Sequence, residues 1–317
     1  MNELAPECFD DARALPHLRV GIGIATSGRP EILNETLQFI GRQSELPEKV
    51  VICPVSATDI SRDALHALPY PVRIAPSASG LTIQRNIILS LMTDSDVVIF
   101  FDDDFIPDVN YIANAKALFQ SDDNIVLATG VLIDDGIHGP GIDPAVAKRR
   151  LLVSPPQPYE PGRERTYYGV YGCNMVARQS AIREAKIQFD EQLPLYGWQE
   201  DIDFSRQMAP YGRIIQTPIL TGIHLGTKRG RTSGLRFGYS QVANPIYLMR
   251  KGTMSIPFGF RTMTRNIIAN IVKSLRPEAH IDRRGRLTGN LLALFDCVRG
   301  HLHPRRILEL EVQPTRH

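Results

Sequence analysis

From Arg19 onward, short runs rich in β-branched and apolar residues alternate with segments of helical periodicity. Such alternation indicates an α/β fold, because parallel strands are joined by crossovers that are usually helices. Strands are expected over 20–25, 49–55, 71–75, 96–101, 125–132, 167–177 and 213–217. Helices are expected after Pro30, over 83–92 and 109–119, and from about Glu200. The pattern predicts a Rossmann-like mixed, mostly parallel sheet flanked by helices.

The chain divides into three predicted segments: an N-terminal tail over 1–17, the α/β domain over 18–250, and a basic helical region over 251–317. Its 43% hydrophobic and 22% charged residues exclude a wholly disordered or fibrous protein. Within the domain, residues 134–165 are rich in glycine and proline and are expected to form a long loop. Long loops in compact domains are usually functional or disordered.

Charge is distributed unevenly along the chain. Residues 250–317 contain 13 Lys or Arg and five Asp or Glu, so they carry +8, whereas the preceding residues carry −6. Two helical stripes of apolar residues are expected in this basic region, Ile267, Ile268, Ile271, Val272 and Leu275 in one, and Leu287, Leu291, Leu294, Phe295, Val298 and Leu302 in the other. Either both stripes pack on the preceding domain, or they make peripheral contact with an anionic membrane, where each basic residue contributes roughly 1 kcal/mol.

The four cysteines are far apart and have no metal-ligand spacing: Cys8, Cys53, Cys173 and Cys297. They are expected to be free thiols in a reducing compartment. No signal peptide and no apolar stretch of roughly 18 residues is visible. A cytoplasmic protein is the expectation, with peripheral contact with the inner face of the cell membrane as one of the two alternatives for the basic region.

Three consecutive acids, Asp102, Asp103 and Asp104, directly follow the apolar run at 97–101. That run is typical of a strand buried on both faces, and ligands of open α/β sheets bind outside the carboxyl ends of strands. Like charges about 4 Å apart in a partly shielded site repel by on the order of a few kcal/mol, and a divalent cation reverses that balance. The alternative is a solvated turn that caps the next helix.

A series of motifs occurs in a recognisable order. It comprises the turn at 26–30, Gln84-Arg85-Asn86, the aspartate triplet, Gly172-Cys173-Asn174-Met175, 189–191, 198–203 and His224. In this order the sequence resembles glycosyltransferase family 2, whose members are inverting enzymes with the GT-A fold that use nucleotide-sugars. The resemblance covers roughly 19–248.

The resemblance implies a donor site and a metal site. Asp102 is expected near the ribose, and Asp104 and His224 on a divalent Mn or Mg ion that bridges the diphosphate. Nucleotide-sugar contacts are expected from Thr26, Ser27, Arg29, Arg85, Asn86, Asp102, Asp103, Lys228 and Arg231. Read singly, Arg85 is also consistent with a surface arginine, His224 with a structural histidine, and the basic loop at 226–234 with a solvated one.

On the acceptor side, the resemblance makes Asp201 the general base, with Glu200 beside it. Such a base contributes about 10²- to 10⁴-fold to the rate. Trp198 could stack on a sugar, while Gly172 and Asn174 would line the acceptor pocket. The alternatives are that Glu200 and Asp201 only cap the helix and that Trp198 only packs in the core.

The predicted activity is therefore inverting transfer of a sugar, most simply from a UDP-sugar, to an acceptor hydroxyl. The acceptor would be a glycan or a lipid-linked glycan, as in the synthesis of cell-surface polysaccharide or glycolipid, and no nucleic acid is expected as a partner. Two alternatives remain open. A nucleotidyltransferase would carry a richer glycine loop after the first strand, and a non-catalytic nucleotide-sugar-binding protein would have degenerate carboxylates.

Overall fold

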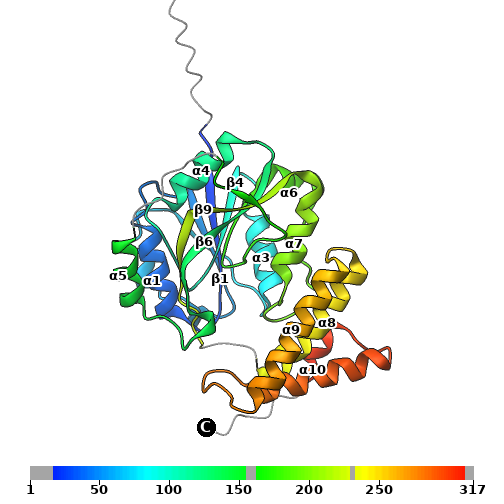
Figure 1. The fold of residues 1–317 in the computed structure, drawn as a ribbon. Coiled ribbons are helices and arrows are strands. Elements are labelled where there is room, and N and C mark those ends of the chain that lie inside the picture. The colour runs from blue at the N-terminus through cyan, green and yellow to red at the C-terminus, as the bar shows by residue number, and fades with distance from the viewer. Residues whose placement is uncertain (1–16, 155–161, 229–232, 311–317) are drawn as a thin grey trace, which may run out of the picture.

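A computed structural model describes residues 17–154, 162–228 and 233–310. In these residues a mixed sheet occupies the centre of the molecule, in the order β3-β2-β1-β4-β8-β6-β9-β5, with β7 paired to β9 (Figure 1). Its strands are β1 (Val20–Thr26), β2 (Lys49–Pro54), β3 (Val72–Ile74), β4 (Val97–Asp102), β5 (Phe105–Pro107), β6 (Ile125–Asp135), β7 (Arg165–Thr166), β8 (Asn174–Arg178) and β9 (Arg213–His224). Strands β3, β2, β1 and β4 are parallel, whereas β8 runs antiparallel to both β4 and β6.

Both faces of the sheet are covered, as the apolar runs predict. In β4, Val97, Ile99 and Phe101 contribute to one buried cluster, while Val98 and Phe100 contribute to the other. The first face packs on α1 (Pro30–Ile40) and α4 (Tyr111–Ser121), and the second on α3 (Leu81–Ser90), α6 (Gln179–Ala185) and α7 (Glu200–Met208). Helix α3 approaches β1 so closely that a Cβ at Gly23 would lie 2.3 Å from the Ile88 side chain.

The segment over 134–165 is more ordered than its composition predicts. Strand β6 continues to Asp135, and α5 (Pro144–Val153) follows; residues 155–161 lie outside the described part. Pro144 lies in the first turn of α5, where its fixed φ suits a helix and no hydrogen bond is lost, and Asp143 accepts from the Ala145 N–H. The expectation of one long loop, drawn from the glycine- and proline-rich composition, therefore missed this helix.

The strand expected over 167–177 forms only from Asn174 onward. The preceding backbone bonds to α7 instead: the Val170 N–H donates to Ser205 Oγ at 3.0 Å, and the Gly172 N–H donates to Asp201 Oδ2 at 3.1 Å. Shorter helical elements complete this part of the fold, namely α2 (Arg62–Leu65) and the 3₁₀ turns Ala57–Asp59, Gly136–His138 and Ala209–Tyr211.

Three helices and a 3₁₀ turn form a C-terminal helical unit beside the sheet (Figure 1). They are α8 (Gly234–Lys251), α9 (Ile256–Ser274), α10 (Arg283–Val298) and Pro304–Leu308. Helix α8 packs against both α9 and α10 around a core of its own that includes Tyr239, Met263 and Ala293. Lys251 ties the unit to the sheet domain through ion pairs with Asp190 and Asp203. None of the helices in the described residues is sufficiently long and apolar to cross a membrane.

Candidate functional site

The aspartate triplet lies where β4 ends and β5 begins. Strand β5 pairs antiparallel with β9 and places Phe105 opposite His224, so the histidine at the end of β9 lies beside Asp104. Asp102 is partly exposed, whereas Asp103 and Asp104 are 0% and 2% exposed. Pairing between distant strands thus brings His224 to the triplet.

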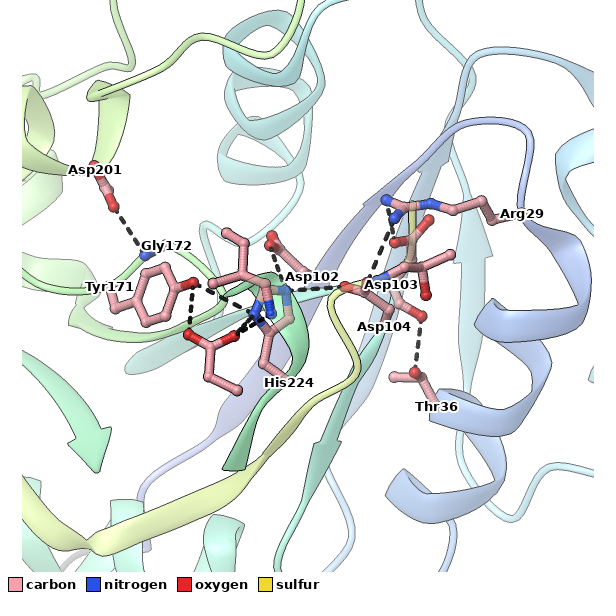
Figure 2. Close-up of polar contacts among 12 residues, drawn as sticks. Arg29, Thr36, Asp102, Asp103, Asp104, Tyr171, Gly172, Asp201 and His224 are labelled. Atoms are coloured by element: carbon pink, nitrogen blue, oxygen red, sulfur yellow. Dashed lines mark hydrogen bonds and ion pairs between the residues drawn. The ribbon is translucent and has the colours of Figure 1, made fainter. Parts of the chain in front are cut away.

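Asp102, Asp104 and His224 form a cluster suited to a metal ion. Their ligand atoms all lie within 4.8 Å of one another. His224 Nε2 is 3.3 Å from Asp104 Oδ1 and 4.0 Å from Asp102 Oδ2 (Figure 2). Two carboxylates and one imidazole are a usual donor set for a divalent transition metal.

Asp135, at the end of β6, orients the histidine. Its Oδ1 is 2.8 Å from His224 Nδ1, and its Oδ2 accepts a hydrogen bond from the Tyr171 hydroxyl at 3.2 Å. This leaves Nε2 facing the triplet. Burial lowers the pKa of His224, but the bonds to Asp104 and Asp135 outweigh it and raise that pKa to about 10. Metal-ligating histidines commonly have such a carboxylate partner on the other ring nitrogen.

Asp103 and Arg29 fix the β1–α1 turn against the triplet. Arg29 Nη2 lies 2.5 Å from Asp103 Oδ1, and Arg29 Nη1 lies 3.5 Å from Asp104 Oδ2. The Thr26 hydroxyl donates to Asp103 Oδ2 at 2.7 Å. Burial raises the pKa of Asp103 to about 7, against the opposing charge of Arg29. Thr26 and Asp103 are buried, whereas Arg29 keeps some exposed surface. Of these three residues, Arg29 is therefore the one that a ligand can contact.

Arg85 is a buried bridge between the triplet and α7. Its side chain is 2% exposed, with Nη1 2.5 Å from Glu200 Oε1 and Nη2 3.2 Å from Asp102 Oδ1. Nη2 also donates to the Gly172 carbonyl at 2.8 Å. A Cβ at Gly172 would lie only 3.2 Å from Glu200 Oε1, so the absence of a side chain there permits this close packing. Arg85 therefore holds groups of the protein in place and has almost no surface left for a ligand.

Asp201 lies apart from the triplet and contacts Gly172, the residue after Tyr171 (Figure 2). It is partly exposed, and its carboxylate accepts from the N–H groups of Gly172 and Ile202. Burial raises the pKa of Asp201 above the ordinary aspartate value, although these bonds and Arg85 oppose the shift. Asp201 and Asp102 are thus connected through the Gly172 peptide and the Arg85 guanidinium.

Other residues expected at the site have contacts elsewhere in the protein. The Asn86 amide donates to the Phe189 carbonyl at 2.9 Å, and Asn174, fully buried, accepts from the Thr129 hydroxyl at 2.6 Å. The Trp198 ring contacts Phe237 edge to face, with centroids 6.0 Å apart.

The turn and loop residues of the expected donor site differ in their surroundings. Ser27 is exposed in the β1–α1 turn. Lys228 Nζ donates to the carbonyls of Gly136 and Ile137 at 3.1 and 2.8 Å, which links the segment after β9 to the end of β6. Arg231 lies outside the described residues.

In sequence, the chain matches no protein-family model and no curated protein. Among solved structures it is similar to the mannosyltransferase PcManGT from Pyrobaculum calidifontis in complex with GDP-Man and Mn²⁺, with a TM-score of 0.54, 16% identity, and coverage of 92% of this chain and 85% of that one. It is also similar to S. aureus TarS 1–349 with UDP-GlcNAc, with a TM-score of 0.55, 13% identity, and coverage of 92% and 83%. It is similar as well to GalNAc-T7 with UDP, GalNAc and Mn²⁺, with a TM-score of 0.56, 14% identity, and coverage of 90% of this chain and 59% of that one. These likenesses confirm the GT-A fold predicted from the sequence.

Replacing Asp135 by asparagine is expected to weaken Mn²⁺ binding by about 10- to 100-fold, because His224 loses the carboxylate that orients its ring. Titration calorimetry with Mn²⁺ in the presence of UDP measures this. Asp134→Asn is the matched control, since the Asp134 side chain pairs with Arg150 rather than with His224. Equal affinities of the two variants would show that Asp135 does not position a metal ligand.

Proposed function

We propose that this protein is a metal-dependent glycosyltransferase that moves a sugar from a nucleoside diphosphate to an acceptor hydroxyl. One observation carries the proposal: the Asp102–Asp104–His224 cluster is joined, through Arg85 and Gly172, to a second carboxylate at Asp201. The similar structures support it, since they are complexes with GDP-Man, UDP-GlcNAc, or UDP and GalNAc, and two of them contain Mn²⁺.

Asp102, Asp104 and His224 would hold the metal. The imidazole favours Mn²⁺ over Mg²⁺, because Mg²⁺ takes oxygen ligands almost exclusively. When bound, the ion supplies Lewis-acid stabilisation of the charge on the departing diphosphate. Arg29, held beside Asp104 and partly exposed, contributes positive charge at the same strand ends.

Asp201 would act as the general base of an inverting transfer. The acceptor oxygen forms a bond to the anomeric carbon while the bond from that carbon to the diphosphate oxygen breaks, and the acceptor's proton passes to Asp201. A raised pKa suits this role, because it makes the carboxylate a stronger base. Glu200 acts indirectly, by anchoring Arg85.

A UDP-sugar is the proposed donor, because two of the three similar structures contain UDP or a UDP-sugar. A glycan or lipid-linked glycan is the proposed acceptor, in cell-surface polysaccharide or glycolipid synthesis at the inner face of the membrane. This assignment rests on the resemblance to glycosyltransferase family 2 and on the basic C-terminal region.

Thermal unfolding with a panel of UDP- and GDP-sugars tests the proposal. At 100 times its dissociation constant, the true donor should stabilise the fold by about 2.7 kcal/mol. The stabilisation should need Mn²⁺ and disappear with EDTA, and the same donor should show Mn²⁺-dependent release of nucleotide. A panel in which no compound stabilises, or in which EDTA has no effect, would contradict the proposal.

A further inference from the structure

Helix α9 has apolar side chains on the side that its neighbours leave uncovered, unlike an ordinary surface helix of a water-soluble protein. Its packed side contains Met263, which belongs to the core of the unit, and Asn270, which is fully buried and hydrogen-bonded to Gln241 and Asn290, each at 2.8 Å. Its other side has apolar residues that are 50–82% exposed, which we call the α9 stripe: Ile256, Phe260, Ile268, Ile271, Val272 and Leu275. The described residues leave these side chains largely uncovered, whereas Ile267, which the sequence placed in the same stripe, packs against the core of the helical unit.

Helix α10 adds a second uncovered apolar surface. Leu291, Leu294, Phe295 and Val298 are exposed, with Val298 at 90%. Contiguous exposed apolar surface of this kind usually marks an interaction site in a soluble protein. The C-terminal helical unit therefore has a core of its own and, outside it, apolar surface that needs a partner.

Charge identifies the partner. Helix α9 contains no Asp or Glu from Ile256 to Ser274, and Arg261 and Arg265 are exposed beside the stripe without an ion pair among the described residues. The acid nearest to α9 along the chain, Glu278, is already paired with Lys273 and Arg283. An uncompensated positive charge next to an apolar stripe fits an anionic bilayer, in which the arginines meet lipid phosphates and the apolar side chains enter the headgroup boundary.

We infer that the α9 stripe binds the surface of an anionic membrane, with the helix lying in the plane of the interface rather than crossing it. A second copy of the chain is a poorer occupant, because self-pairing would bring Arg261 and Arg265 close to the same residues of the other copy. The inference does not depend on glycosyl transfer, since membrane binding can be measured without a donor or an acceptor.

Sedimentation of the full chain with vesicles tests this. Binding to phosphatidylcholine vesicles containing phosphatidylglycerol should exceed binding to pure phosphatidylcholine vesicles, and it should fall as salt rises. The double variant Arg261→Gln, Arg265→Gln should lose about 25-fold in partitioning, from roughly fivefold per basic residue. Replacing Val272 and Leu275 by serine should lose at least about tenfold, because both side chains leave the bilayer boundary.

Matched double variants at exposed positions away from α9 serve as controls. Arg62→Gln with Arg73→Gln removes the same charge, and Leu152→Ser with Val153→Ser removes similar exposed apolar surface. Both should bind vesicles within twofold of the unmodified chain. Equal losses in the control and stripe variants, or equal binding to neutral and anionic vesicles, would overturn the inference. So would a dimer, detected by light scattering, that the stripe variants dissociate while vesicle binding is absent.

Discussion

Asp201→Asn is expected to reduce sugar transfer by about 10²- to 10⁴-fold, the usual contribution of a general base. Asparagine has nearly the same shape and can still accept the Gly172 N–H, but it cannot take a proton from the acceptor. Affinity for UDP and Mn²⁺ should stay nearly unchanged, because Asp201 is not part of the Asp102–Asp104–His224 cluster and bonds instead to the N–H groups of Gly172 and Ile202.

Two measurements separate catalysis from binding. Nucleotide release, assayed with the nucleotide-sugar that stabilises the protein most, reports turnover, and calorimetry with UDP and Mn²⁺ reports binding. Asp63→Asn, at an exposed acid of α2, is the control for loss of a negative charge. In the unmodified protein, kcat/KM should decline at low pH with a pKa above the ordinary aspartate value, since burial raises the pKa of Asp201. Normal turnover by Asp201→Asn would refute the assignment of the base.

The sheet and the pairing of Asp104 with His224 could be predicted from the sequence. The apolar runs that predict strands are local, and the site motifs occur in a recognisable order. The apolar run before Asp102 predicts a strand covered on both faces, and β4 alternates its side chains between two cores. Asp104 and His224, far apart in sequence, were paired through the order of motifs, and the pairing of β5 with β9 places them together.

Asp135 was missed because it lies in a segment read as a loop. Strand β6 pairs with β9 with bulges and extends to Asp135, which lies opposite His224. Two adjacent acids, Asp134 and Asp135, follow shortly after the strand predicted over 125–132, much as the triplet follows the apolar run at 97–101. A second carboxylate-terminated strand could therefore have been recognised from the sequence.

The position of Arg85 could not be predicted from periodicity. Motif order placed it near the donor, but its burial depends on Gly172 and Glu200, which come from segments about a hundred residues away. Likewise, the apolar stripes of α9 and α10 were visible in the sequence, whereas which face packs depends on the amide network around Asn270. In both cases tertiary packing determines which side chains are buried, and the local sequence pattern does not specify this.

Asp104→Asn should abolish the metal dependence of nucleotide binding. The substitution removes one negative ligand from the cluster, and the amide oxygen can still accept the Thr227 N–H, which now donates to Asp104 Oδ2 at 2.8 Å. Since the loss of a residue that merely orients a ligand costs 10- to 100-fold in metal affinity, the loss of a ligand should cost at least about 100-fold. EDTA should then weaken UDP binding strongly in the unmodified protein and hardly at all in the variant.

Asp103→Asn is the matched comparison within the triplet. Asp103 is enclosed and bonded to Thr26 and Arg29, outside the cluster of candidate ligands, so its variant should keep UDP binding that is sensitive to EDTA. Thermal unfolding of both variants without metal verifies that each is folded, because Asp104 also pairs with Arg29. If Asp104→Asn bound UDP as tightly as the unmodified protein, with and without EDTA, the metal would have to lie elsewhere, and Asp104 and His224 would be only a structural ion pair.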